Sequence, residues 1–182
     1  MQLRPADQDA AAARARSAGR RRGAELNDLL VALLDQAFDR PSWHGTNLRG
    51  ALRRLDPERA AWRPGPRRHN AWELIVHCAY WKYTVWRRFD GAARGSFSLP
   101  GSDWFERPIA TTAEALRGDV ALLEEWHAKL RATVAAAEPA VFARATGKGR
   151  FTVRELVTGA AAHDLYHAGQ IQLLKRLHGE RR

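Results

Sequence analysis

The sequence predicts an all-α fold, a four-helix bundle with a long crossover between its second and third helices. Three observations carry this prediction. Four long segments place apolar residues at helical spacing, start and stop signals bound most of them, and no segment alternates as a β-strand does. At 182 residues the chain has the length of one domain, which can bury a core without cross-links. Its single cysteine excludes a disulfide framework.

The first 22 residues contain little that a fold could bury. They are rich in Ala, Arg and Asp and end in three consecutive arginines. We therefore expect a disordered or frayed arm over residues 1–22 and the folded bundle over residues 23–182. The first bundle helix is expected over residues 24–38, where leucines form one stripe. The breaker Asp-Arg-Pro-Ser at 39–42 separates it from a short helical piece over residues 47–55.

Each of the three remaining helices begins with a capping box, in which two side chains satisfy exposed backbone N–H groups reciprocally. The three boxes pair Asn70 with Glu73, Thr111 with Glu114, and Thr152 with Glu155. Stop signals follow at residues 90–91, 138–139 and 179. A loop of about twenty residues separates the first two of these helices. Such a loop is long enough to carry the chain back along the bundle.

Two of the helices place histidines inside their apolar stripes. At about 100° per residue, His163 and His167 fall within the stripe of the last helix, one turn apart. His77 lies within the stripe of the second long helix. Burying unpartnered imidazoles is costly, and one divalent metal satisfies all three. An apolar-face histidine is also a common hydrogen-bonded core residue, so the two interpretations stand side by side.

The helical rise tests whether the three histidines can meet. His77 lies about 18 Å before the end of its helix, and His163 about 17 Å after the start of the last helix. The levels match if these two helices are antiparallel, and miss by a turn or two if they are parallel. The spacing therefore favours an antiparallel pair. Gly159, one turn before His163, leaves space beside it.

Several neighbours are further candidates for the site. Gln170 faces the ligands and could bind a substrate or cap a buried group. Asp164 could orient a ligand imidazole or lie in solvent. Glu73 lies one turn before His77, but its capping box already employs it. The residues expected to form a wider pocket are Trp43, His44, Asn47, Trp81, His127 and Gln170. For His127, a place in the apolar core is an equal alternative.

Two segments resemble the DinB/YfiT-like superfamily of metal-binding bundles. They are Glu-Leu-Ile-Val-His at 73–77 with Trp81, and His-Asp-Leu-Tyr-His-Ala-Gly-Gln-Ile at 163–171. The resemblance covers about residues 24–177. It implies a bundle in up-down-down-up order, often a homodimer, with His77, His163 and His167 as metal ligands. Characterised relatives include S-transferases and an isomerase that use low-molecular-weight thiols. Because all three histidines are present, the chain resembles the transferase-like branch more closely.

Composition and site together restrict the function. The net charge of +10 comes from scattered arginines without a nucleic-acid motif, so we do not expect nucleic-acid binding. No apolar stretch approaches the roughly 20 residues of a membrane span and no secretory signal is evident, so we expect a cytoplasmic protein. Three nitrogen ligands leave a metal position open, as catalytic sites do. Zinc or nickel is expected, with iron as an alternative.

Our leading hypothesis is a metal-dependent thiol transferase that acts on a small-molecule substrate. Such a site would hold a low-molecular-weight thiol cosubstrate as the reactive thiolate. A metal-dependent hydrolase is the first alternative, because a metal can also activate water. A non-catalytic metal-bearing stress or binding protein is the second. The sequence pattern fits all three of these functions.

Overall fold

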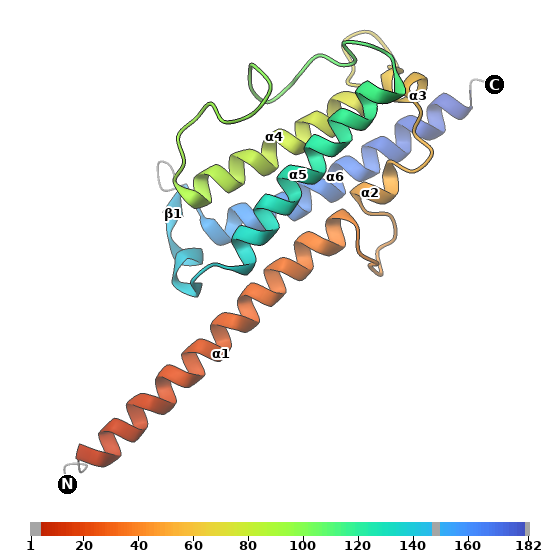
Figure 1. Ribbon diagram of the computed structural model, residues 1–182. Coiled ribbons are helices and arrows are strands. Elements are labelled where there is room, and N and C mark those ends of the chain that lie inside the picture. Colours follow the sequence, from red (N-terminus) through yellow and green to blue (C-terminus); the bar gives the residue numbers. More distant parts are fainter. Residues whose placement is uncertain (1–4, 147–149, 181–182) are drawn as a thin grey trace.

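A computed structural model describes residues 5–146 and 150–180, and most of them are helical (Figure 1). The all-α class is therefore confirmed. Within these residues, no helix is both long and apolar enough to cross a bilayer. The elements in chain order are α1 (Pro5–Phe38), α2 (Leu48–Ala51), α3 (Pro57–Ala61), α4 (Ala71–Asp90), α5 (Ala113–Ala135), the 3₁₀-helix η1 (Pro139–Ala143), β1 (Ala145–Thr146), β2 (Phe151–Thr152) and α6 (Val153–Gly179).

Helix α4 packs against both α5 and α6, and side-chain contacts fix the direction of each pair. Near the start of α4, the indole of Trp72 donates a 2.7 Å hydrogen bond to Asp119 of α5. Near its end, the rings of Trp86 and Trp126 lie 5.4 Å apart. The chain order of these contacts makes α4 and α5 parallel.

The pair α4 and α6 runs in the opposite sense. The ring of His77 lies 4.9 Å from that of His167, while Trp81, one turn later on α4, lies 6.2 Å from His163. Later residues of α4 therefore meet earlier residues of α6. Helix α1 is likewise antiparallel to α5, because Asn27 bonds the carbonyl of Ala137 at 2.8 Å whereas Asp35 pairs with Arg131.

The crossover loop, residues 91–112, follows from the parallel direction of α4 and α5. It leaves the end of α4 and returns along the outside of the helices to the start of α5 (Figure 1). Phe97 and Phe105 anchor it, since both are buried in the cluster that α4, α5 and α6 form. Near its end, Arg107 donates to Asp119 at 2.7 Å. These contacts hold the loop against the helices at residues 97, 105 and 107.

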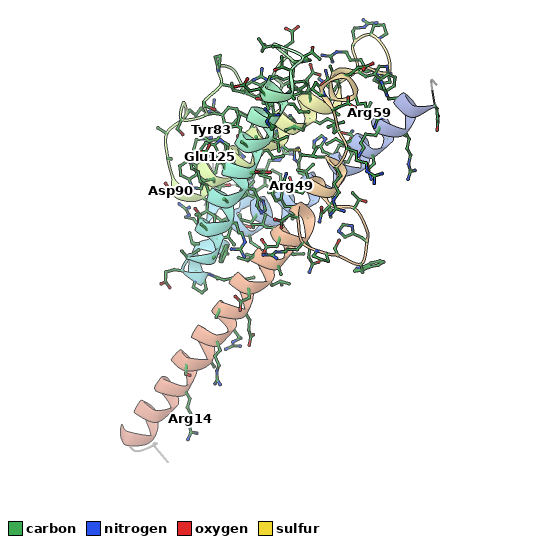
Figure 2. All side chains as sticks on the ribbon, turned by 45° about the vertical axis from the view of Figure 1, so that its right-hand side comes forward. Arg14, Arg49, Arg59, Tyr83, Asp90 and Glu125 are labelled. Atoms are coloured by element: carbon green, nitrogen blue, oxygen red, sulfur yellow. The ribbon has the colours of Figure 1, made fainter. Side chains whose placement is uncertain are left out.

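The start of α1 differs from the prediction. The helix begins at Pro5 instead of residue 24, and its first half projects away from the other helices (Figure 1). Ala and Arg are strong helix formers, so local propensity extends the helix where there is nothing to bury. Figure 2 shows Arg14 far from the bundle, and Arg21 and Arg22 are exposed. A frayed arm over residues 1–22 stays a prediction; residues 1–4, and residues 181–182 at the other end, lie outside the described residues.

The short elements also differ in detail. The piece expected over residues 47–55 ends at Ala51, and Asp56 then caps a separate helix, α3. Residues 145–146 and 151–152 pair as a two-stranded hairpin that is too short to show alternation, so the expectation of no strand was wrong. Residues 147–149 lie outside the described residues. The capping boxes of Asn70 and Thr152 are confirmed, whereas α5 is capped by Thr112, one residue later than predicted.

Candidate metal centre

The three histidines turn their Nε2 atoms toward a common point. His77 comes from α4, and His163 and His167 from α6. The Nε2 atom of His163 lies 3.2 Å from Nε2 of His77 and 3.0 Å from Nε2 of His167. One nitrogen from each ring lies within 4.8 Å of the others. The antiparallel pairing of α4 and α6 therefore brings the three side chains to one level.

Hydrogen bonds on the far side of two rings determine which nitrogen carries the hydrogen. Nδ1 of His77 donates to the backbone carbonyl of Asp103 at 2.8 Å. Nδ1 of His167 donates to Oε1 of Gln170 at 2.6 Å. In a neutral imidazole the other nitrogen is then a bare acceptor. The Nε2 atoms of His77 and His167 thus both present lone pairs to the centre of the cluster.

A cation between these lone pairs would satisfy all of them together. His163 can place one hydrogen on its Nε2, which satisfies one neighbour and leaves the other facing a nitrogen without a donor. Zn²⁺ binds imidazole nitrogen at about 2.0–2.1 Å, so a tetrahedral angle separates two ligand nitrogens by about 3.3 Å and a right angle by about 2.9 Å. The two separations in the structure lie between these values. The residues present therefore fit a small divalent transition metal with one or more positions open.

The rings are also in the protonation state that a metal requires. Burial lowers the pKa of His163 to about 3, and the neighbouring His167 lowers it further in the same direction. Burial lowers the pKa of His167 to about 4. Burial also lowers the pKa of His77, although its hydrogen bond to the Asp103 carbonyl opposes the shift. All three imidazoles are neutral at pH 7. No ring therefore has to lose the extra proton of its charged form before a metal binds.

The crossover loop covers the cluster. Asp103 binds His77 through its carbonyl and accepts from the indole N–H of Trp81 at 2.9 Å through its carboxylate. Trp104 stacks on His77 at 3.8 Å between ring centroids, with His69 on its other face at 3.6 Å. Sequence reasoning missed Asp103 and Trp104, because a loop has no periodicity. The length of the loop was the only signal that it serves the site.

Glu73 and Asp164 are both engaged away from the cluster. Arg63 holds the carboxylate of Glu73 with two hydrogen bonds of 2.5 and 2.8 Å. Asp164 is neither an orienting partner of an imidazole nor solvated. Its side chain is 1% exposed and pairs with Lys82 of α4, which is equally buried. One feature of the sequence agrees with the burial of Lys82. It lies four residues after Cys78, and both side chains lie on an inward face of α4.

The other predicted pocket residues divide into two groups. Trp81 and Gln170 lie beside the cluster, through the contacts given above. His127 stacks on Phe38 at 3.8 Å inside the apolar core, the alternative that its sequence position left open. Asn47 caps α2, His44 is exposed and bonded to Ser42, and Trp43 is 99% exposed. Within the described residues, no hydrogen bond or ring contact joins these last four residues to the three histidines.

A second group of potential ligands overlaps the first. Cys78, His163 and Asp164 also place one ligand atom each within 4.8 Å of one another. Burial raises the pKa of the Cys78 thiol, which keeps it protonated. Lys82 already holds a carboxylate oxygen of Asp164. The three-histidine cluster is therefore the better candidate.

Comparison with known proteins places this site in a family. No curated protein and no solved structure gave a match. The family model of the DinB superfamily matches residues 42–171. That range covers most of the chain and contains α4, the crossover loop, α5 and all three histidines. The chain therefore belongs to the DinB superfamily.

Proposed function

We propose that this protein is a metal-dependent enzyme that transfers a low-molecular-weight thiol to a small-molecule electrophile at the three-histidine site. The convergence of three neutral Nε2 atoms, two of them held as bare acceptors, is the observation that carries the proposal. A bound divalent metal, zinc or nickel with iron as the alternative, would supply a Lewis acid that favours the thiolate form of a thiol.

The protein's own residues would orient the ligands and limit access to water. The carbonyl of Asp103 and the amide of Gln170 hold two imidazoles in the ligand tautomer. Trp81 and Trp104 pack against the rings and exclude water from that side. These contacts would keep the site rigid. They leave its approach to a cavity that Trp81 of α4 and His163 of α6 line.

The position of the carboxylates favours a thiol over water as the nucleophile. Glu73 is bound by Arg63, and Asp164 by Lys82, so neither is free to take a proton from water. The carboxylate of Asp103, beside His77, already accepts a hydrogen bond from the indole of Trp81. A thiol needs less help, because its ordinary pKa of about 8.5 already lies near neutrality. A metal-dependent hydrolase is therefore the second candidate, and a non-catalytic metal-bearing stress or binding protein the third.

The proposal extends to the architecture. An up-down-down-up bundle is supported by the parallel contacts of α4 with α5 and by the antiparallel contacts of α4 with α6 and of α1 with α5. A homodimer, a cytoplasmic location and a domain boundary near residue 23 are further parts of the proposal that rest on the sequence.

The test measures turnover of metal-loaded protein with a panel of small thiols and a chromogenic electrophile, beside ester hydrolysis. Thiol-dependent product formation should be lost in His77→Ala and kept in His178→Ala, which removes a histidine about 16 Å along α6 from His167. Hydrolysis without thiol dependence would favour the second candidate. Metal binding without turnover of either kind would favour the third.

A further inference from the structure

A cavity of about 250 Å³ opens between α4 and α6 and reaches the candidate metal centre. His163 and Trp81 form one end of it. Val85 and Leu156 supply apolar side chains along its length, and Arg88 lies at the opposite end. We call this cavity the α4–α6 groove. It joins a metal-binding end to a cationic end through an apolar middle.

The helical rise gives the length of the groove. Trp81 and Arg88 are seven residues apart on α4, which corresponds to about 10 Å along the helix axis. Because α6 runs antiparallel, the level of Arg88 corresponds to the segment of α6 near Leu156, where the groove ends. A ligand that contacts both ends must therefore span about 10 Å.

Gly159 lies in the middle of this groove, inside α6. A glycine in a helix interior costs about 1 kcal/mol relative to alanine. Apart from the backbone of its own helix and its two chain neighbours, a Cβ at this position would meet no atom of the described residues within 4 Å, so packing among them does not require the glycine. Space for a ligand accounts for it, because any side chain at 159 would project into the groove.

Arg88 belongs to a group of four arginines that we call the arginine cluster: Arg87, Arg88, Arg94 and Arg150. All four line a neighbouring cavity of about 590 Å³, and three of them also line a cavity of about 780 Å³ beneath the crossover loop. Within residues 5–146 and 150–180, no carboxylate forms an ion pair with any of the four.

The acidic residue that lines the groove forms no ion pair with this cluster among the described residues. Glu155 lines the same cavity, but its Oε2 accepts from the backbone N–H and the hydroxyl of Thr152 in the capping box of α6, each at 2.7 Å. Arg87 donates to the carbonyl of Ala92 at 3.4 Å, and Arg150 lies over the Phe151 ring. Several guanidinium N–H donors thus remain available, in the planar geometry that binds carboxylate and phosphate groups.

We propose that the α4–α6 groove binds a small molecule with a metal-ligating atom at one end, an apolar middle, and an anionic carboxylate or phosphate group about 10 Å from the ligating atom. Arg88 and the arginine cluster hold the anionic group. The ligating end rests on the proposed function of the three histidines. The inference of an apolar middle and an anionic group depends only on the groove and the arginines.

Three thiols of defined chemistry test this ligand class by calorimetric titration into the metal-loaded protein. Mercaptooctanoate carries all three features, mercaptooctanol lacks the charge, and mercaptopropionate lacks the apolar length. We expect mercaptooctanoate to bind at least about tenfold more tightly than either of the others, because a charge-assisted arginine contact and apolar burial are both lost. Thiol ligation itself is followed by the charge-transfer absorption of the cobalt-substituted protein.

Variants separate the two ends of the groove. Arg88→Gln should lower the affinity for mercaptooctanoate toward that for mercaptooctanol and leave the affinity for mercaptooctanol unchanged. Gly159→Leu should weaken both long thiols by about tenfold or more and leave mercaptopropionate unaffected. Arg117→Gln removes an exposed arginine of α5 outside the groove and is the matched control. Octanoate and octyl phosphate, tested without a thiol, determine which anion the cluster prefers.

The outcomes distinguish the inference from the proposed function. If the metal binds and all three thiols ligate cobalt with equal affinity, the inference is wrong while the metal site stands. If wild-type protein binds no metal, the proposed function fails. In that case, octanoate binding that Arg88→Gln and Gly159→Leu both weaken still supports the groove, and its absence overturns the inference.

Discussion

Lys82 and Asp164 join α4 to α6 through a buried ion pair, and removing one partner should destabilise the fold strongly. Each side chain is 1% exposed. The substitution Lys82→Met keeps most of the stem volume but leaves a buried carboxylate without its countercharge. The Oδ1 atom of Asp164 already lacks a partner among the described residues. Breaking such a pair costs about 3–5 kcal/mol, and we expect this loss in the free energy of unfolding.

The pH dependence of this deficit has a defined sign. Burial raises the pKa of Asp164 above its ordinary 3.8, although Lys82 opposes the shift. Without Lys82 the folded-state pKa rises further, so the folded protein holds a proton that the unfolded chain releases. Stability then falls as the pH rises from about 4 through the folded-state pKa. The deficit of Lys82→Met relative to wild type should therefore shrink on acidification.

Urea unfolding followed by circular dichroism, with a chelator present, measures both effects at about pH 7.5 and pH 5. The double variant Lys82→Met/Asp164→Leu is the control, because it removes both charges together. We expect it to be more stable than Lys82→Met alone. A deficit of less than about 1 kcal/mol for Lys82→Met, or one that does not change with pH, would refute the reasoning.

Three further predictions concern residues around the site. Burial lowers the pKa of His127 to about 3, so the unfolded chain takes up a proton below about pH 6.5 and the folded state does not. Acidification from pH 7.5 to 5 should cost about 2 kcal/mol through this residue; the loss of stability measured by urea unfolding should therefore be about 2 kcal/mol smaller in His127→Leu than in wild type. Gln170→Leu removes the acceptor on His167 and should weaken metal binding about 10- to 100-fold in chelator competition; an unchanged affinity would contradict its orienting role. Gly159→Ala should raise the free energy of unfolding by about 1 kcal/mol, and lower stability would show that the glycine has a packing role.

Features with a local signal could be predicted from the sequence. The capping boxes at Asn70 and Thr152 depend on residues three apart, and both are present. The histidines stood out because helical periodicity placed polar rings on apolar stripes. Their common level followed from the constant rise per residue, because the number of residues from a helix end gives the distance along the helix axis. The cluster of His77, His163 and His167 could therefore be proposed from the sequence, on the condition that their two helices are antiparallel.

Features that depend on distant contacts could not be found in this way. Asp103 and Trp104 reach His77 only because the crossover loop is pinned by aromatic anchors far from any helix pattern. Lys82 is buried because α4 packs on two sides, so its inward surface is wider than one stripe. The same limit applied to Asp164, whose partner lies 82 residues away in the chain.

Metal content of the purified protein tests the central claim most directly. Elemental analysis of wild type, His163→Ala and His178→Ala, each incubated with zinc, nickel and iron(II) and then desalted, compares a ligand with a histidine elsewhere on α6. We predict about one metal ion per chain in wild type and His178→Ala, and little in His163→Ala. Equal metal content in all three proteins, or none in wild type after incubation with each metal, would contradict the account.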